Sequence, residues 1–327
     1  MTKIRNFGFG AGCGAVSALM FSIVATGSPL SLVLYAAAPL PILIAALGFT
    51  HQAGLVAAVT AMLAVLLIFS PVASLAYGIA IGIPSWGLGL AVNLAREHEG
   101  KVEWYPLGKI LAWIIGVSAF LTLAGSLALA PDYQGFIAAF DEFADAVESV
   151  DPALFAGMDA SQHADAISAL SRLMALIAPP ISAAISVISF VALIYLAARI
   201  VKASSRLPRP WPDLAQVALP RTAVIVLALS VIGSVFLPDY AGLLSRITLA
   251  ALTMGFCIQG LAFVHLISRP LKQRRPVLGM LYFTFLALPG WPVLGFALVG
   301  VADAWFSLKE RRIADAPSIF LKPDQDA

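Results

Sequence analysis

The chain has 327 residues, of which 60% are hydrophobic and only 12% are charged, and its formal net charge at pH 7 is +2. Its mean hydropathy is +0.92. In soluble domains roughly a quarter of the residues are charged, so this composition excludes an ordinary water-soluble fold. Apolar runs long enough to cross a hydrocarbon core of about 30 Å recur along most of the sequence. Because these runs show no alternation of polar and apolar residues, they predict helices rather than a β-barrel.

The first part of the chain predicts five membrane-spanning helices. Lys3 and Arg5 precede the first apolar run, which we interpret as an uncleaved helix rather than a signal peptide, because a second apolar stretch follows at once. A short polar loop at 96–109 separates the fourth helix from the fifth. The five predicted spans are 7–26, 29–49, 51–69, 72–94 and 110–130.

A large acidic segment, 131–178, follows the fifth predicted span. Apolar residues recur in it at helical spacing, and a second amphipathic stretch covers 161–177. We expect these stretches to lie on the membrane surface or to cap the bundle, and a lid or a partner-docking element is the alternative. The apolar residues at helical spacing are Phe136, Phe140, Phe143 and Val147.

Three further spans and a C-terminal apolar block follow the acidic segment. Pro179 and Pro180 precede the sixth span, where proline fits the first helical turn. A basic, proline-rich linker at 202–212 comes after it. The last block, 277–306, is broken by proline and glycine at 289–292, so it forms either a hairpin of two short helices or one kinked helix. The predicted sixth, seventh and eighth spans are 181–201, 222–237 and 243–267.

The basic residues predict the orientation of the chain in the membrane. If the N-terminus lies in the cytoplasm and the helices alternate, only Arg172 and Arg246 among the lysines and arginines fall outside. The acidic residues of 131–178 then also fall outside, as the positive-inside rule predicts. A single crossing by 277–306 would leave Lys309 and its basic neighbours outside, so the hairpin is preferred, and both termini are expected in the cytoplasm.

The predicted fold class is therefore an all-α polytopic bundle of eight clear spans and a C-terminal hairpin. We expect a single membrane domain that covers residues 1–327. Its parts are helices 1–5 at 7–130, the amphipathic extracytoplasmic loop at 131–178, helices 6–8 with the hairpin at 181–306, and a cytoplasmic tail at 307–327.

Prolines within the predicted spans mark the first candidate binding residues. Pro39 and Pro41 lie near the middle of the second span, and Pro84 interrupts the fourth. A proline inside a helix removes a backbone donor and frees a carbonyl. Transporters commonly bind their substrate where helices are broken near the midplane. Many such prolines are only kinks whose freed groups are satisfied by neighbouring helices, and this alternative is open.

Hydroxyl side chains form two stripes at helical spacing. Ser182 and Ser186 continue into Ser189 on one face of the sixth span, and Ser118 and Thr122 continue into Ser126 on one face of the fifth. These side chains are candidates for the lining of a polar cavity. The alternative is that each hydroxyl donates to a carbonyl of the preceding helical turn.

Asp303 lies inside an apolar segment, near the end of the last block. An ionisable group within the membrane is by default a functional hypothesis. Asp303 is also close enough to the predicted interface to pair with Arg269, Lys309 or Arg311, which would make its role structural. His265, near the end of the eighth span, is ambiguous for the same reason.

The sequence contains no signature of an enzyme. It has no phosphate-binding glycine loop, no dinucleotide fingerprint, no zinc spacing and no nucleophile elbow. Cys13 and Cys257 are far apart and fit neither a metal site nor a disulfide framework. We therefore expect no catalytic residue, no metal and no cofactor. Glycine pairs four residues apart, such as Gly10 and Gly14, predict closely packed helices.

Several motifs resemble the YybS-like family, a family of uncharacterised bacterial multi-pass inner-membrane proteins. The motifs are the glycine-rich first helix, Tyr35-Ala-Ala-Ala-Pro-Leu-Pro41, Glu103-Trp-Tyr-Pro106 followed by Gly108, and Gly300-Val-Ala-Asp-Ala-Trp305. The resemblance covers nearly the whole chain and implies a bacterial inner-membrane location. The family is distantly grouped with the substrate-binding subunits of energy-coupling-factor transporters, which implies a transporter-like core without naming a substrate or a catalytic residue.

These observations favour a small-solute transporter or a solute-binding membrane subunit, with a polar cavity near the midplane. The alternative is a scaffold that recruits a protein partner through its basic cytoplasmic loops or its acidic outer loop. Membrane lipid is an expected partner and nucleic acid is not. The sequence predicts no particular oligomeric state.

Overall fold

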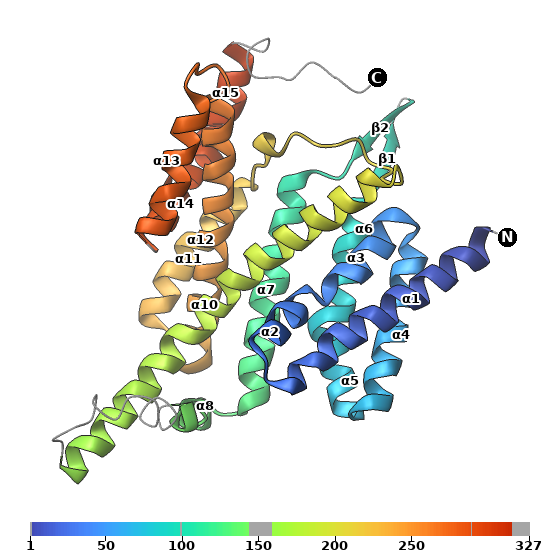
Figure 1. The fold of residues 1–327 in the computed structure, drawn as a ribbon. Coiled ribbons are helices and arrows are strands. Elements are labelled where there is room, and N and C mark those ends of the chain that lie inside the picture. Colours follow the sequence, from blue (N-terminus) through green and yellow to red (C-terminus); the bar gives the residue numbers. More distant parts are fainter. Residues whose placement is uncertain (1, 99, 144–158, 289, 316–327) are drawn as a thin grey trace.

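The computed structural model describes residues 2–98, 100–143, 159–288 and 290–315, which form a bundle of helices (Figure 1). Within these ranges, seven helical segments are long and apolar enough to cross a membrane, or eight if one bent pair of helices is counted as a span. Large apolar side chains point outward, including Leu67 at 86% exposure and Leu286 at 81%. Lipid accommodates such a surface, whereas water does not. The predicted all-α membrane bundle is confirmed.

The elements of the first half are α1 (Thr2–Ser22), η1 (Ile23–Thr26), α2 (Pro29–Ala37), α3 (Pro39–Gly48), α4 (His51–Ile68), α5 (Pro71–Tyr77), the π turn η2 (Gly78–Gly82), α6 (Ile83–Val92), β1 (Ala95–His98), β2 (Lys101–Trp104), α7 (Leu107–Leu129) and α8 (Tyr133–Ala138). Those of the second half are α10 (Ala160–Ala203), η4 (Leu214–Gln216), α11 (Arg221–Phe236), α12 (Asp239–Ile267), α13 (Arg274–Ala287), α14 (Trp291–Phe306) and α15 (Leu308–Asp315).

Small residues bring α1 close to α4. A β-carbon built on Gly10 would lie 2.5 Å from the carbonyl oxygen of Ala53, and one built on Gly14 would lie 2.3 Å from that of Ala57. A larger residue at either position would therefore collide with the backbone of α4. The glycines confirm the predicted close packing, because their lack of a side chain lets the two helices touch.

The second span consists of two helices, α2 and α3, which meet at Ala38. Pro39 occupies the first turn of α3, where its missing N–H leaves no helical bond unmade. The Ser17 hydroxyl of α1 donates to the carbonyl oxygen of Ala38 and also lies 2.6 Å from the hydroxyl of the buried Tyr77. Side chains of α1 and α5 thus support the break.

The fourth span is interrupted by the π turn η2, directly before Pro84. Proline has no N–H to bond the carbonyl of Ala80, four residues earlier. The turn widens at this point, and the N–H of Ile83 donates to the carbonyl of Gly78. The wider turn is the local response to a proline inside a span.

A small β-hairpin occupies most of the loop that we predicted at 96–109. Strands β1 and β2 are antiparallel, with Ala95 opposite Trp104 and Glu97 opposite Val102. Gly100 has φ +75°, a left-handed conformation that glycine adopts without a steric penalty.

The longest helix, α10, crosses the centre of the bundle and contacts α3, α7 and α12 (Figure 1). We predicted a separate amphipathic stretch and a span that begins after Pro179 and Pro180, and this division was wrong: α10 is a continuous helix of 44 residues. The two prolines remove only the bonds to the carbonyls of Ala175 and Leu176. Ala175 and Ala183 are fully packed on either side of them, so tertiary contacts hold the helix together.

The acidic segment begins with the short helix α8, which caps one end of the bundle. Asp132 caps its N-terminus by accepting a hydrogen bond from the N–H of Gly135 at 2.7 Å. Phe136 is buried, and its ring lies 5.8 Å from that of Tyr240 on α12. The ring of Phe140 lies 5.3 Å from that of Phe136. These contacts support the predicted capping role, while Val147 lies outside the described residues.

The last apolar block forms two short helices, as the hairpin interpretation predicted. Helices α13 and α14 lie side by side (Figure 1), and the rings of Phe285 and Phe296 stack with centroids 5.3 Å apart. After α14, the chain bends by 68° into α15. The helix α11 is also short, with 16 residues, or about 24 Å at 1.5 Å per residue. It lies within one residue of the predicted seventh span at each end, but it is not among the seven long apolar helices counted in the described residues.

The ends of the bundle differ in character. The start of α1, the β1–β2 hairpin and α15 lie at one end, and α8 and the start of α10 lie at the opposite end (Figure 1). The basic loops of the sequence thus share one side of the bundle, which we call the hairpin end.

Candidate functional site

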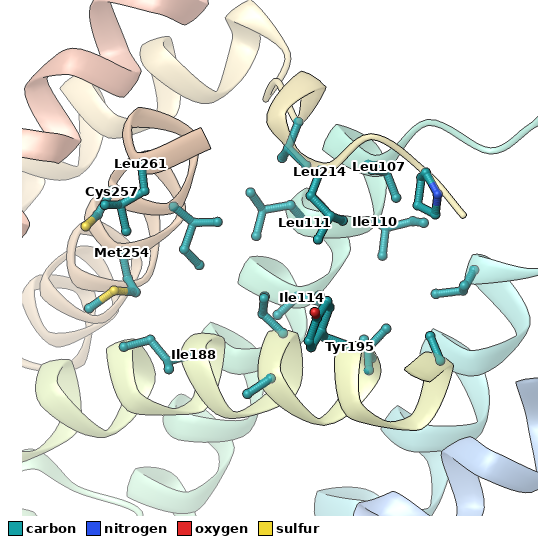
Figure 2. A pocket seen from close by; sticks show the side chains of 18 of the residues that line it. Leu107, Ile110, Leu111, Ile114, Ile188, Tyr195, Leu214, Met254, Cys257 and Leu261 are labelled. Carbon is teal, nitrogen blue, oxygen red and sulfur yellow. The ribbon is translucent and has the colours of Figure 1, made fainter. Parts of the chain in front are cut away.

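An apolar cavity of about 520 Å³ lies between α7, α10 and α12 (Figure 2). Ile110, Leu111 and Ile114 face it from α7, and Met254 and Cys257 face it from α12. Helix α10 contributes Ile188 and Tyr195, among others, while Phe285 of α13 and Val293 of α14 complete the wall. A cavity of this size and lining suits a small molecule that is mostly hydrocarbon.

The linker between α10 and α11 covers the cavity at the hairpin end. It contributes six lining residues: Leu207, Arg209, Trp211, Pro212, Leu214 and Val217. The linker also touches the start of α7, where a β-carbon on Gly108 would lie only 1.6 Å from the carbonyl oxygen of Ala218. Glycine at position 108 is therefore required for the linker to take this path.

Polar contacts fix the linker to the helices beneath it. The N–H of Leu219 donates to the side-chain oxygen of Gln259 on α12 at 2.8 Å. The ammonium group of Lys309 on α15 donates to the carbonyl of Val217. Arg269, just after α12, forms an ion pair with Asp213. The cover of the cavity is thus part of the ordered bundle.

Arg209 is the one charged side chain among the described lining residues. It is 8% exposed, donates a hydrogen bond to the carbonyl oxygen of Val92 at 3.1 Å, and lies 5.9 Å from the centre of the Trp104 ring. Val92 is the last residue of α6, so the guanidinium also meets the partial negative charge of a helix C-terminus. Burial lowers the pKa of Arg209 from its ordinary value, because the charged form loses its hydration.

Two aromatic side chains with cations beside them lie at the linker side of the cavity. The rings of Tyr195 and Trp211 meet edge to face, with centroids 5.7 Å apart. Arg199 lies 6.0 Å from the centre of the Tyr195 ring, and Lys202 lies 5.3 Å from that of Trp211. Cations at these distances interact with the negative faces of the rings, so each of the two aromatic side chains has a cation beside it.

Asp303 belongs to a buried polar network at the hairpin end. Its carboxylate accepts hydrogen bonds from the side-chain amide of Gln259 at 2.7 Å and from the backbone N–H of Lys309 at 2.8 Å. The Lys309 ammonium lies 3.4 Å from the same carboxylate. Asp303 is 3% exposed and Lys309 is 4% exposed. The network ties α14 and α15 to α12. A pairing of Asp303 with Lys309 is the structural role that we gave as the alternative to a functional one.

The chain matches a family of membrane proteins. A comparison with protein-family profiles aligns residues 15–304 with "Predicted membrane protein (DUF2232)". The chain belongs to this family. Neither the curated proteins nor the solved structures gave a match. The DUF2232 assignment agrees with the resemblance to the YybS-like family, and the link to energy-coupling-factor transporters stays a prediction.

The aligned range of the DUF2232 family includes every residue that lines the cavity, from Val92 to Val293. It also includes Asp303 and Gln259, but it ends before Lys309. The family match therefore covers nearly the whole chain, and the helices around the cavity lie within it.

The predicted proline residues lie away from this cavity. Pro39, Pro41 and Pro84 are buried among α1–α6. Asn93, just after α6, donates to the carbonyls of Ala46 and Leu47 at the end of α3. None of these prolines lines the cavity, and their proposed role in binding stays a prediction.

The predicted hydroxyl stripes also do not line the cavity. Ser118 is fully buried, and its hydroxyl oxygen has no hydrogen-bond partner among the described residues. The Thr122 hydroxyl donates to the carbonyl of Ser118 at 2.9 Å, which is the bond to the preceding turn that we described as the alternative. On α10, Ser182 is exposed and Ser186 is half-buried. The cavity found between α7, α10 and α12 is apolar, although we expected a polar one.

Sequence reasoning missed Tyr195, Arg209 and Trp211. We assigned 202–212 only as a basic, proline-rich linker and did not place it against the helices. A signal for the packing of this linker was present in the sequence. The apolar residues Leu207, Trp211 and Leu214 recur there among polar residues and prolines. Apolar residues in a short loop indicate that the loop packs on the protein, but they do not indicate on which surface it packs.

Proposed function

We propose that this DUF2232 protein is a solute-binding subunit of the bacterial inner membrane, which holds a hydrophobic small molecule in the cavity between α7, α10 and α12. The cavity volume of about 520 Å³ and its apolar surface support this proposal. Small-molecule sites in proteins commonly have volumes of roughly 300–1,000 Å³ with a few polar groups that orient the ligand. Here the wall presents apolar surface, so the bound molecule would be held by apolar contacts and by the rings of Tyr195 and Trp211.

The proposed orientation places the hairpin end, and with it both termini, in the cytoplasm. Lysines and arginines are concentrated in the N-terminal segment, the β1–β2 hairpin, the linker and α15. The positive-inside rule places such segments on the cytoplasmic side. The linker would then separate the cavity from the cytoplasm, while Ile188 and Tyr195, which are 46% and 42% exposed, would lie beside the lipid.

A cavity-filling variant tests the proposal. In Ala198→Phe, the added ring would occupy space that is lined by α10, whereas Ala184→Phe places the same ring at a half-buried alanine of α10 that does not line the cavity. The full-length protein, purified in mild detergent, is titrated with a fluorescent apolar probe and examined by native mass spectrometry. We expect the wild type and Ala184→Phe to bind the probe and Ala198→Phe to bind it at least about tenfold more weakly.

Absence of probe binding by a folded wild-type protein would contradict the proposal. Equal binding by Ala198→Phe and the wild type would contradict it as well. Circular dichroism and thermal unfolding of each variant separate a loss of binding from a loss of fold.

A role in binding a protein partner is the second candidate, and the length of α10 favours it. With 44 residues, α10 is about 66 Å long, roughly twice the thickness of the hydrocarbon core. Its first turns project beyond the bundle at the end opposite the hairpin end (Figure 1). A stable complex that forms with the wild type and is lost after Leu173→Glu, a substitution at a half-exposed residue of α10, would support this role.

A further inference from the structure

Helix α12 carries one apolar face that is packed along its first half and left open along its second. Leu243 and Ile247 are fully buried. Met254 and Ile258 continue the same face, because residues three, four or seven positions apart lie on one side of a helix. These two side chains are only half-buried, and they line the cavity.

Helix α10 shows the same change along its length. Ala183 and Val187 are fully buried, whereas Val191 and Ile194, which follow at helical spacing, are half-buried and line the cavity. The two helices contact each other, and their fully buried residues belong to one core cluster. The cavity therefore begins where the packing of α10 against α12 ends, and Figure 2 shows side chains of both helices around this space.

The cavity is continuous with the lipid-facing surface of α10. Ile181 and Ile185 are exposed on this candidate membrane span. Ile188 and Tyr195 extend the exposed stripe at helical spacing, and both line the cavity. The opposite wall is α7, where Ile114 is only 3% exposed. Because this family consists of membrane proteins, the exposed stripe meets the hydrocarbon core of the bilayer, and the cavity opens from that interface.

The physical chemistry of the wall selects the kind of molecule that can fill it. A buried water needs two to four polar partners, and the wall presents apolar surface. An empty space would deprive the lining side chains of dispersion contacts. The hydrocarbon chains of the bilayer adjoin the opening, and their abundance there favours their binding by mass action.

We propose that the molecule in the cavity is a lipid of the surrounding bilayer, one of whose hydrocarbon chains enters sideways between α10 and α12 and reaches α7. This inference rests on the proposed function, because it names the class of the bound molecule. Ile188 and Ala198, which both line the cavity, are ten residues apart, or about 15 Å along the helix. This length is about half the thickness of the hydrocarbon core, as for a chain of one leaflet.

The headgroup of this lipid would stay outside the cavity, at the membrane surface. The apolar wall offers it no hydrogen-bond partner, and burial of a polar group without a partner is unfavourable. The linker covers the cavity at the hairpin end through the hydrogen bond of Leu219 to Gln259 and that of Lys309 to Val217. The chain therefore enters from the side of the bundle.

Photolabelling from within the bilayer tests this inference. Full-length protein is placed in phosphatidylcholine nanodiscs that contain a small fraction of the same lipid with a diazirine at the end of one acyl chain. After illumination, mass spectrometry of peptides locates the labelled residues. Ile114 lines the cavity, whereas Ile42 of α3 is fully buried and does not line it, so Ile42 is the internal control. A lipid with the diazirine in its headgroup is the control reagent.

We expect the chain diazirine to label Ile114 and to leave Ile42 unlabelled, and the headgroup diazirine to label neither. In Ala198→Phe the added ring takes the space of the chain, so labelling of Ile114 should fall at least about tenfold. Ala184→Phe, away from the cavity, should keep it. An excess of the fluorescent apolar probe should also lower the labelling of Ile114 in the wild type, which needs no substitution.

Three results would overturn the inference. They are a folded wild type without label at Ile114, equal labelling of Ile42 and Ile114, and labelling of Ile114 by the headgroup reagent. If the apolar probe binds the wild type while the lipid chain leaves Ile114 unlabelled, the cavity holds a hydrophobic molecule that is not a bilayer lipid, and only this inference fails. If neither the probe nor the chain reaches the cavity, the proposed function fails as well.

Discussion

Asp303 and Lys309 form a buried ion pair across the 68° bend between α14 and α15, with 3.4 Å between the carboxylate and the ammonium group. Gln259 connects this pair to the linker, because its amide donates to Asp303 and its oxygen accepts from Leu219. The cover of the cavity is therefore coupled to the C-terminal helices through a chain of buried polar contacts.

Removal of the Asp303 charge should destabilise the protein strongly. Asp303→Asn leaves the Lys309 ammonium buried without its counter-ion, which typically costs about 3–5 kcal/mol. We expect a clear fall in the midpoint of thermal unfolding in detergent. Asp315→Asn, at an exposed carboxylate of α15, should leave the midpoint unchanged.

The double variant Asp303→Leu/Lys309→Met separates a missing charge from a missing contact. It removes both charges, so it should be more stable than Asp303→Asn alone. An Asp303→Asn variant as stable as the wild type would show that the pair does not hold α15 to the bundle.

Glycine at position 260 sets the distance between α12 and α14. A β-carbon there would lie 2.0 Å from the carbonyl oxygen of Phe296, which belongs to the backbone and cannot rotate away. Gly260→Ala should therefore destabilise the protein by about 1–3 kcal/mol, as overpacking typically does. Gly279→Ala on α13, where nothing lies within 4 Å, is the control. Chemical unfolding of both variants measures the difference, and equal stabilities would contradict the close contact.

The start of α10 should loosen in acid. Asp159 accepts hydrogen bonds from the backbone N–H groups of Gln162 and Ser161, and these bonds lower the pKa of its carboxyl below the ordinary value. A carboxyl group whose pKa is lowered in the folded state stabilises the fold at pH values above its ordinary pKa. That stabilisation disappears as the pH falls through the lowered value.

Hydrogen exchange at the first turn of α10 measures this effect. After correction for the intrinsic pH dependence, the amides of Ser161 and Gln162 should lose protection at the acid end. Asp159→Asn also caps helices but does not titrate in this range, so its protection should not change with pH. If protection in the wild type is equally constant, the capping interaction is absent.

The proposed orientation predicts which positions a membrane-impermeant thiol reagent reaches in intact cells. In a background without Cys13 and Cys257, a cysteine at Asp165 on α10 should react from outside. A cysteine at Lys101 on β2 should react only after the membrane is opened. Both residues are exposed, so accessibility to the reagent depends on the side of the membrane. Labelling of Lys101→Cys in intact cells would show that the orientation is the reverse of the proposed one.

Local sequence patterns predicted the membrane bundle, the C-terminal hairpin and the close packing at Gly10 and Gly14. These features depend on hydropathy, helix breakers and residue size over short stretches. Hydropathy also placed the seventh span, 222–237, within one residue of α11 at each end. The division at Pro179 and Pro180 was wrong because contacts on both sides of the prolines hold α10 together.

The cavity between α7, α10 and α12 was not predictable in the same way. Arg209 contacts the carbonyl of Val92, 117 positions earlier in the chain, and no local pattern indicates which loop covers which helices. The partner of Asp303 was easier to predict, because its charge and its position near the predicted interface suggested Lys309 as one of three partners. Ser118 and Thr122 have helical spacing, yet their spacing did not show whether they face a cavity or a neighbouring helix.

The most direct test of the proposed binding site is an experimental structure of the full-length protein in lipid nanodiscs. We expect density for a hydrophobic molecule between α7, α10 and α12. A map in which side chains such as Ile114 and Met254 close the cavity, with no density between them, would contradict the proposal that this cavity holds a hydrophobic small molecule.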